Sequence, residues 1–287
     1  MSEYENYDET SRHYDETRKP VGIEIILGCL IGAEKPLSEM VVLDAGCGTG
    51  SYAIEVAKFV GRVAAVDASE GMLRQARTRA DGTLMADKLS FQLASIDALP
   101  FADASFDAVM VNQVLHHVGS GSENLDPYRA VLNELARVVR PGGVLVINMC
   151  SIDQLHGGWW YAELFRGAFE RMAKRHIGIS DLTDLLGECG FIHRGRIVPT
   201  DAVFQGKAYF ERTGPLRKEW RDGDSLFALT TEEELQGACS TILQLEENGT
   251  LEDYVARNDA LREQIGQVTF VHSLRAAEHT HQGSGGQ

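Results

Sequence analysis

The chain has 287 residues, of which 44% are hydrophobic and 24% are charged, as in ordinary globular proteins that bury a full core. Its 27 basic and 42 acidic side chains give a formal charge of −15, which opposes binding to nucleic acid or to an anionic membrane. The five cysteines are widely spaced and form no CxxC pair, so we expect no disulfide framework, no metal site and a reducing, cytoplasmic compartment.

Residues 1–35 are predicted to form an N-terminal helical arm. The tetrapeptide Tyr-Asp-Glu-Thr occurs at 7–10 and again at 14–17, and this charged stretch is either a lid over a ligand or a solvated tail. The apolar segment 21–33 is too short to cross a bilayer and contains Glu24, so it is predicted to be a core helix.

Strand and helix signals then alternate. Apolar runs predict strands at 41–44, 62–67, 89–94, 108–111 and 144–150, and the segments between them predict helices at 51–59, 69–79 and 128–139. Ser69 is a suitable N-cap for the second helix, and Arg140-Pro-Gly-Gly143 is expected to stop the third. This order predicts an α/β fold with a Rossmann-like, doubly wound and mostly parallel sheet.

Beyond residue 151 the pattern is looser. A helical stretch is expected to begin at Gly157, and a helix at 181–189 should end at Gly190. Strands near 191–198 and 267–274 are predicted to complete a seven-stranded sheet, with helices at 231–245 and 251–265 inserted between them. We therefore expect residues 36–151 to form the ligand-binding core, 152–278 to complete the sheet and carry a helical substrate cap, and 279–287 to be a disordered tail.

The glycine-rich stretch after the first strand is the strongest functional signal. Asp44 precedes Gly46, Gly48 and Gly50, and a turn of this kind lets backbone amides approach a nucleoside-like ligand. A dinucleotide GxGxxG motif beginning at Gly46 would need glycine at position 51, where Ser51 stands. A nicotinamide-dependent oxidoreductase is therefore disfavoured.

Asp44 followed by GxGxG resembles motif I of class I S-adenosylmethionine-dependent methyltransferases. Four further segments agree in order: Val66-Asp-Ala-Ser69 with Met72, Asp97-Ala-Leu-Pro-Phe101 with Ser105-Phe-Asp107, Val114-Leu-His-His117, and Arg140-Pro-Gly-Gly143. Over residues 15–151 the chain resembles the methyltransferase type 11 family, the ubiquinone/menaquinone-biosynthesis-like branch. The resemblance implies an enzyme that transfers a methyl group from S-adenosyl-L-methionine to a small-molecule acceptor by in-line displacement.

The same resemblance implies how the cofactor is held. Asp67 would accept hydrogen bonds from the ribose hydroxyls, and Asp44 would face the cationic methionine end. Ser95 stands where relatives often carry an acid, so either Ser95 or Asp97 is expected to contact adenine. The expected cofactor-binding residues are Tyr14, Arg18, Asp44, Gly46, Gly48, Gly50, Asp67, Ala68, Met72, Ser95, Ile96, Asp97, Asn112 and Gln113.

Nucleic acid is rejected as a substrate on a second ground. An amino-methyltransferase acting on DNA or RNA would show Asn/Asp-Pro-Pro-Tyr/Phe after the fourth strand, and residues 112–115 read Asn-Gln-Val-Leu. We therefore expect a small-molecule acceptor and neither a nucleic acid nor a membrane partner.

The catalytic group and the acceptor are less well defined by the sequence. Candidates for a general base are His117, His156 and Tyr161, although a His-His pair in this branch usually packs behind the cofactor. Candidates for acceptor contacts are His116, His117, Trp159, Trp160 and Tyr161; the two tryptophans either line a pocket or anchor the inserted helices. The acceptor, the methylated atom, the need for a base and the oligomeric state stay open, and the alternative function is a non-catalytic, cofactor-binding regulator.

Overall fold

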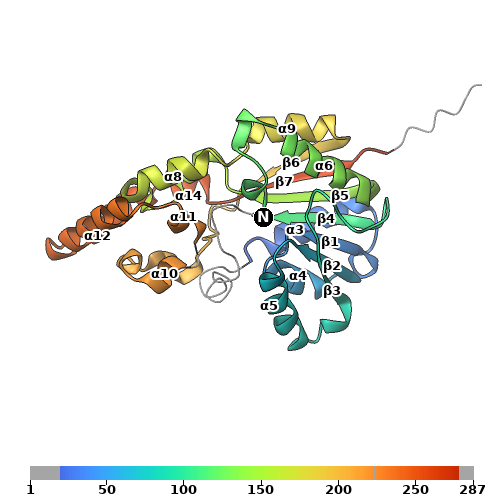
Figure 1. The fold of residues 1–287 in the computed structure, drawn as a ribbon, viewed down its shortest axis with the longest axis horizontal. Helices are drawn as coiled ribbons and strands as arrows, with labels where there is room; N and C mark the ends of the chain where they lie inside the picture. Colours follow the sequence, from blue (N-terminus) through green and yellow to red (C-terminus); the bar gives the residue numbers. More distant parts are fainter. Residues whose placement is uncertain (1–19, 223, 278–287) are drawn as a thin grey trace, which may run out of the picture.

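A seven-stranded sheet forms the centre of the protein, whose computed structural model describes residues 20–222 and 224–277. The strands are β1 (Val41–Ala45), β2 (Arg62–Asp67), β3 (Leu89–Leu93), β4 (Phe106–Asn112), β5 (Val139–Met149), β6 (Phe191–Ile197) and β7 (Thr269–Arg275). Their order is β3-β2-β1-β4-β5-β7-β6; β1 to β5 pair in parallel, and β7 runs antiparallel to β5 and β6. The prediction of a Rossmann-like, mostly parallel seven-stranded sheet is confirmed (Figure 1).

Helices cover both faces of the sheet because successive strand residues point to opposite sides. On β1, Val42 belongs to the buried cluster that contains Val56 of α4, whereas Leu43 belongs to the cluster that contains Leu132 of α6. The first face carries α3 (Ile23–Leu30), α4 (Ser51–Ala57) and α5 (Glu70–Asp81), and the second carries α6 (Asp126–Val138) and α9 (Ile179–Glu188). The sheet is therefore doubly wound, as expected.

The segment 140–143 lies inside a strand, which corrects the expected helix-stopping turn. Helix α6 ends at Val138, and Val139 already pairs with Phe106 at the start of β5. Arg140 Nε then donates to Asp107 Oδ1 at 2.7 Å, which ties the proline-containing stretch to β4. The helix therefore ends before the Pro-Gly pair, because Val139 pairs with β4.

The helical stretch expected to begin at Gly157 is also corrected, since helix α7 (Ile152–Gly157) ends there. Ser151 caps this helix through a capping box: its hydroxyl accepts from the amide of Gln154, whose side chain accepts from the amide of Ser151. The chain then turns through Gly158 into a short 3₁₀ helix (Ala162–Phe165) and α8 (Arg166–Ala173).

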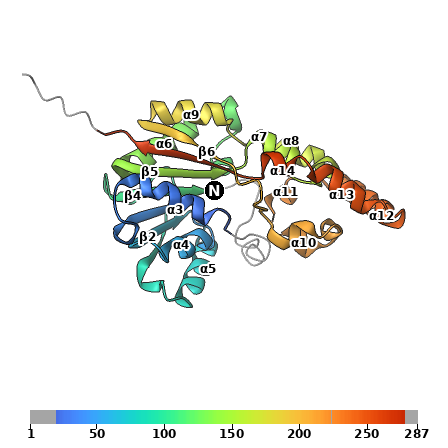
Figure 2. The same ribbon diagram turned by 180° about the vertical axis from the view of Figure 1, so that it is seen from behind.

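A group of helices lies beyond the edge at which the parallel strands end (Figures 1 and 2). After β6 these are α10 (Lys218–Asp222), α11 (Ser225–Ala228), α12 (Glu232–Glu247), α13 (Leu251–Asp259) and α14 (Arg262–Ile265). The helix predicted at 251–265 is thus divided into α13 and α14. β5 leads into α7 and β7 follows α14, so these helices cover the carboxyl end of the sheet.

Some of the predictions concern residues that the structure does not describe. Tyr14, Arg18, most of the arm and the tail at 279–287 lie outside the described residues. Within residues 20–222 and 224–277, no helix has both the length and the hydropathy needed to span a bilayer.

Candidate functional site

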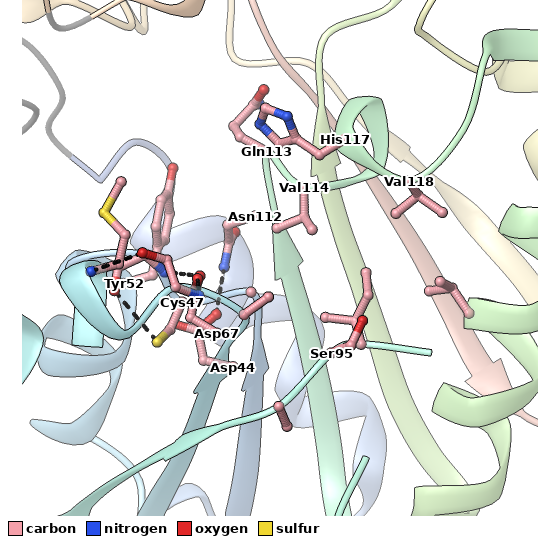
Figure 3. A pocket seen from close by; sticks show the side chains of 18 of the residues that line it. Asp44, Cys47, Tyr52, Asp67, Ser95, Asn112, Gln113, Val114, His117 and Val118 are labelled. Atoms are coloured by element: carbon pink, nitrogen blue, oxygen red, sulfur yellow. Dashed lines mark hydrogen bonds between the residues drawn. The ribbon is translucent and has the colours of Figure 1, made fainter. Parts of the chain in front are cut away.

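A cavity of about 340 Å³ opens where β1, β2 and β4 end (Figure 3). The chain order of the sheet reverses between β1 and β4, and ligands of open α/β sheets bind at such a switch point. The volume lies at the lower end of the range for small-molecule sites, about 300–1,000 Å³. The geometry of the fold and the size of the cavity therefore indicate the same place for a ligand.

The glycine turn forms one wall of this cavity, and Gly46 and Gly50 have different structural roles in it. Gly46 and Gly48 line the cavity, and a side chain at Gly46 would place Cβ 2.5 Å from a methyl carbon of Val114. Gly50 does not line it; there a Cβ would lie 3.1 Å from Ala76 Cβ on α5. Gly46 thus allows the Val114 side chain to pack closely on the turn, and Gly50 allows α4 to pack against α5.

Asp67 joins the glycine turn to the start of α5. The amide of Gly48 donates to its Oδ2 at 2.8 Å, and the amide of Ser69 donates to its Oδ1 at 2.9 Å. Ser69, as expected, caps α5 by accepting from the amide of Met72. Burial raises the pKa of Asp67, against the effect of these amide donors. Each carboxylate oxygen keeps a lone pair with which it can accept from a ligand.

Asp44 and Asn112 place unsatisfied polar atoms at the cavity wall. Both side chains are buried, and Asn112 Nδ2 lies 3.5 Å from Asp44 Oδ1. Asp44 Oδ2 and Asn112 Oδ1 have no hydrogen-bond partner among the described residues. Because buried acceptors without partners are rare and costly, this pair fits a ligand that brings hydrogen-bond donors, above all a cationic amino group.

Burial raises the pKa of Asp44 from 3.8 to about 7, and the nearby charge of Asp67 adds to the effect. The Asn112 amide acts in the opposite direction, as does the N–H of Ala53. At neutral pH the carboxyl group is thus divided between its acid and carboxylate forms, and a bound cation would favour the carboxylate.

We expect Asp44→Asn to remove one component of the pH dependence of stability. Between pH 4 and 7 the native Asp44 holds a proton that the unfolded chain has lost, so its contribution makes the protein less stable as pH rises through this window. The component is on the order of a few kcal/mol, and urea unfolding of both proteins at several pH values measures it. Parallel curves for wild type and variant would contradict the assignment.

Gln113 is held in a strained backbone conformation by buried partners. Its φ is 57°, its amide donates to Asn148 O at 2.8 Å, and its Nε2 donates to Asn148 Oδ1 at 3.0 Å. Asn148 Nδ2 in turn donates to Tyr52 Oη at 3.0 Å, and Tyr52 Oη accepts from the amide of Val21 at 3.1 Å. The network connects the chain that follows residue 20 to the cavity, and such strain is frequent at functional sites.

The expected adenine residues lie together on the opposite wall. Ser95, Ile96 and Asp97 all line the cavity; Ile96 is buried, whereas Ser95 and Asp97 are exposed. Val114 and Val118 face the cavity from the loop after β4 (Figure 3). The wall therefore combines apolar side chains with a hydroxyl and a carboxylate, and the choice between Ser95 and Asp97 stays a prediction.

The histidine candidates are separated by the fold. His117 lines the cavity, whereas His116 is buried behind it, with its ring centre 4.9 Å from that of His176 in a parallel stack. His156 is exposed and lines neither this cavity nor the smaller one described below. Of the three candidates for a base, only His117 reaches the main cavity.

The three aromatic candidates for acceptor contacts also differ in whether they line a cavity. Trp159 and Tyr161 line the smaller cavity, and the Tyr161 hydroxyl donates to Gln205 Oε1 at 3.2 Å. Trp160 lines neither cavity; its indole donates to Tyr209 O at 3.0 Å, and its amide donates to Tyr209 Oη at 3.0 Å. Trp160 therefore anchors the inserted helices.

Sequence reasoning missed several residues of the site. Tyr52, Phe204 and the Asn148 that supports Gln113 received no role. Only Asn148 left a signal, a polar side chain inside the otherwise apolar run 144–149. Phe204 comes from the insertion, which no motif covers. The expected residues Asp44, Gly46, Gly48, Asp67, Ala68, Met72, Ser95, Ile96, Asp97, Asn112 and Gln113 all line the cavity.

Comparison with known proteins agrees with this geometry. The model of a family described as "Methyltransferase domain" matches residues 43–147. The uncharacterised methyltransferase Rv0089 of Mycobacterium tuberculosis is 32% identical over 143 residues, which cover 50% of this chain and 67% of that protein. The O-methyltransferase resE of Aspergillus sclerotiorum is 34% identical over 113 residues, which cover 39% of this chain and 40% of that protein, so this chain spans less than half the length of that relative.

Among solved structures, a putative methyltransferase from an antibiotic biosynthesis pathway of Anabaena variabilis superposes with a TM-score of 0.70. At 23% identity it covers 90% of this chain and 99% of its own, so the common fold includes the helical insertion as well as the sheet. The matched residues 43–147 contain the glycine turn, Asp67 and Asn112, which form the walls of the cavity. The chain belongs to the methyltransferase domain family.

Proposed function

We propose that this protein transfers a methyl group from S-adenosyl-L-methionine to a small-molecule acceptor. The observation that carries the proposal is the pair of unpartnered buried acceptors, Asp44 Oδ2 and Asn112 Oδ1, at the wall of a cavity that also holds a glycine turn and Asp67. A nucleoside with a cationic amino-acid tail has a donor for each of these groups.

The residues present fit this cofactor along its length. Asp44 and Asn112 would bind the ammonium group of the methionine end, and the amides of the glycine turn would lie beside it. Asp67 would accept from the ribose hydroxyls with its free lone pairs. The adenine ring would lie between Ile96 and Val114, with Ser95 and Asp97 near it.

Bound S-adenosylmethionine supplies an electrophilic methyl group, so the chain has to align the acceptor and exclude water. Gln113 and Phe204 lie where the main cavity meets a smaller one, and the hydrogen bonds to Asn148 fix the Gln113 side chain there. His117 lines the main cavity, and its imidazole is placed to take a proton if the acceptor releases one. Asp44 attracts the cationic donor more strongly once its own proton is lost.

Isothermal titration calorimetry with three ligands tests the proposal. S-adenosylmethionine and S-adenosylhomocysteine should bind with dissociation constants on the order of micromolar, and NAD should not bind. The affinity for S-adenosylhomocysteine should fall as pH drops below 7, because protonated Asp44 no longer attracts an ammonium group. Binding of NAD in place of the two sulfur compounds would contradict the proposal.

Turnover distinguishes an enzyme from a non-catalytic binding protein. Incubation of the protein with S-adenosylmethionine and a broad panel of charged and uncharged small-molecule acceptors should release S-adenosylhomocysteine, detected by mass spectrometry. Tight binding without release across the panel would favour the regulatory alternative.

A further inference from the structure

A second cavity, of about 40 Å³, adjoins the main one. Gln113 and Phe204 line both cavities, so the two spaces meet at these side chains. The walls of the second cavity are mostly apolar and aromatic, with Leu155, Trp159, Phe169 and Met172 among them. Since one water occupies about 30 Å³ of liquid, the second cavity has room for a small end group and not for a whole ligand.

The described residues that line the two cavities include no lysine and no arginine. Carboxylates line them instead: Asp44, Asp67 and Asp97 in the first and Asp224 in the second. Asp224 accepts from the amide of Leu226 at 3.0 Å and from Gln205 Nε2 at 3.2 Å, so it is part of the local structure. A phosphate or carboxylate buried here would lie beside these carboxylates, and the described part of the lining offers no basic side chain to offset the repulsion.

His176 supplies the second cavity with a hydrogen-bond acceptor of fixed orientation. The side chain is buried, and its Nδ1 lies 2.9 Å from Met172 O. A carbonyl oxygen can only accept, so Nδ1 carries the proton and Nε2 carries the lone pair. Burial lowers the pKa of His176 to about 4, so the ring is neutral at physiological pH. The parallel stack with His116 holds the plane of the ring.

Building on the proposed function, we propose that the methyl acceptor is an uncharged molecule with an apolar body, whose O–H or N–H group enters the second cavity and donates to Nε2 of His176. The body then spans the boundary at Gln113 and Phe204, which places the rest of the acceptor beside the main cavity. His176 is thus an acceptor-binding residue that orients the molecule, and the methylated atom lies on the side of Gln113.

Two substitutions separate this role from a structural one. His176→Asn keeps an N–H where Nδ1 lies, and so keeps the bond to Met172 O, but removes the acceptor at Nε2. His176→Gln does the reverse, since its Oε1 reaches the place of Nε2 while the bond to Met172 O is lost. If His176 only stabilises the fold, the Gln variant should therefore show the larger loss of acceptor affinity. If His176 binds the acceptor, the Asn variant should show the larger loss.

Calorimetric titration of catechol and of phenyl phosphate into the complex with S-adenosylhomocysteine provides the measurement. Wild type should bind catechol, and phenyl phosphate should bind at least about tenfold more weakly because the carboxylates of the described lining repel its charge. His176→Asn should weaken catechol binding about five- to tenfold, the loss of one hydrogen bond, and His176→Gln should stay within about twofold of wild type.

The affinity for S-adenosylhomocysteine is the control, and it should not change in either variant. Equal binding of phenyl phosphate and catechol, unchanged catechol affinity in the Asn variant, or no catechol binding to an intact cofactor complex would each overturn this inference. Failure of wild type to bind S-adenosylhomocysteine would instead overturn the proposed function, so the two failures are distinguishable.

Discussion

Asp67→Ala should lower the affinity for S-adenosylhomocysteine by at least about tenfold, and by up to about a thousandfold. The proposed hydrogen bonds from the ribose to this carboxylate would be lost, and bonds to a charged group contribute about 1.5–3 kcal/mol each. The amides of Gly48 and Ser69 would also lose their acceptor, which releases the glycine turn from the start of α5. Isothermal titration calorimetry measures the change directly.

Asp81→Ala is the matched control for this substitution. Asp81 is an exposed carboxylate at the last residue of α5 and lines neither cavity, so its loss should leave cofactor affinity unchanged. Thermal unfolding of both variants verifies that the fold is intact at the temperature of the titration. If folded Asp67→Ala protein bound S-adenosylhomocysteine as tightly as wild type, the proposed contact between Asp67 and the ribose would be wrong.

Trp160→Ala should cost about 3–5 kcal/mol in the free energy of unfolding, the largest effect on stability that we expect of a single substitution here. The side chain is fully buried, and its ring packs edge to face against Tyr161 at 5.3 Å between ring centres. Trp160→Phe fills most of the space but leaves Tyr209 O without its indole donor, so it should cost about 1–3 kcal/mol. Urea unfolding at pH 7 gives both values.

Leu243→Ala provides the comparison, because Leu243 is a large apolar side chain that is 54% exposed on α12. Its removal should change stability by no more than about 0.5 kcal/mol. A cost below about 1 kcal/mol for Trp160→Ala would contradict the anchoring role. If Trp160→Phe instead lowered the affinity for the acceptor and left the free energy of unfolding unchanged, Trp160 would be an acceptor contact.

The sheet was predictable because its strands are short, apolar and bounded by turn residues. β2 begins and ends where the hydropathy pattern placed it, and β6 and β7 were each recognised within two residues at both ends. Helix α7 was missed although Ser151 and Gln154 have the spacing of a capping box, since the glycine and tryptophan residues that follow appeared to begin a helix. The short helices α10 and α11 show no periodic apolar pattern, so the sequence did not reveal them.

The two cavities differ in how far the sequence predicts them. The main cavity is built from strand ends and the turns beside them, so the motifs there, through their resemblance to the methyltransferase family, predicted Asp44, Asp67 and Asn112 as ligand-binding residues, and all three line it. The second cavity combines residues as distant in the chain as Gln113, His176 and Asp224, which approach one another only through tertiary packing. His176 lies in no motif; burial determines its protonation, and the bond to Met172 O determines which nitrogen carries the proton, neither of which a sequence displays.

β6 and β7 are neighbours in the sheet, although the helices α10 to α14 separate them in the chain. The chain thus leaves the sheet at one point and re-enters it on the adjacent strand, so the length and content of residues 198–268 can change without any strand losing its pairing partner. Phe204 and Asp224 belong to this interval, whereas Asp44, Asp67 and Asn112 belong to the sheet. This interval can therefore be exchanged or resized to fit a different acceptor without a change in the residues of the proposed donor site.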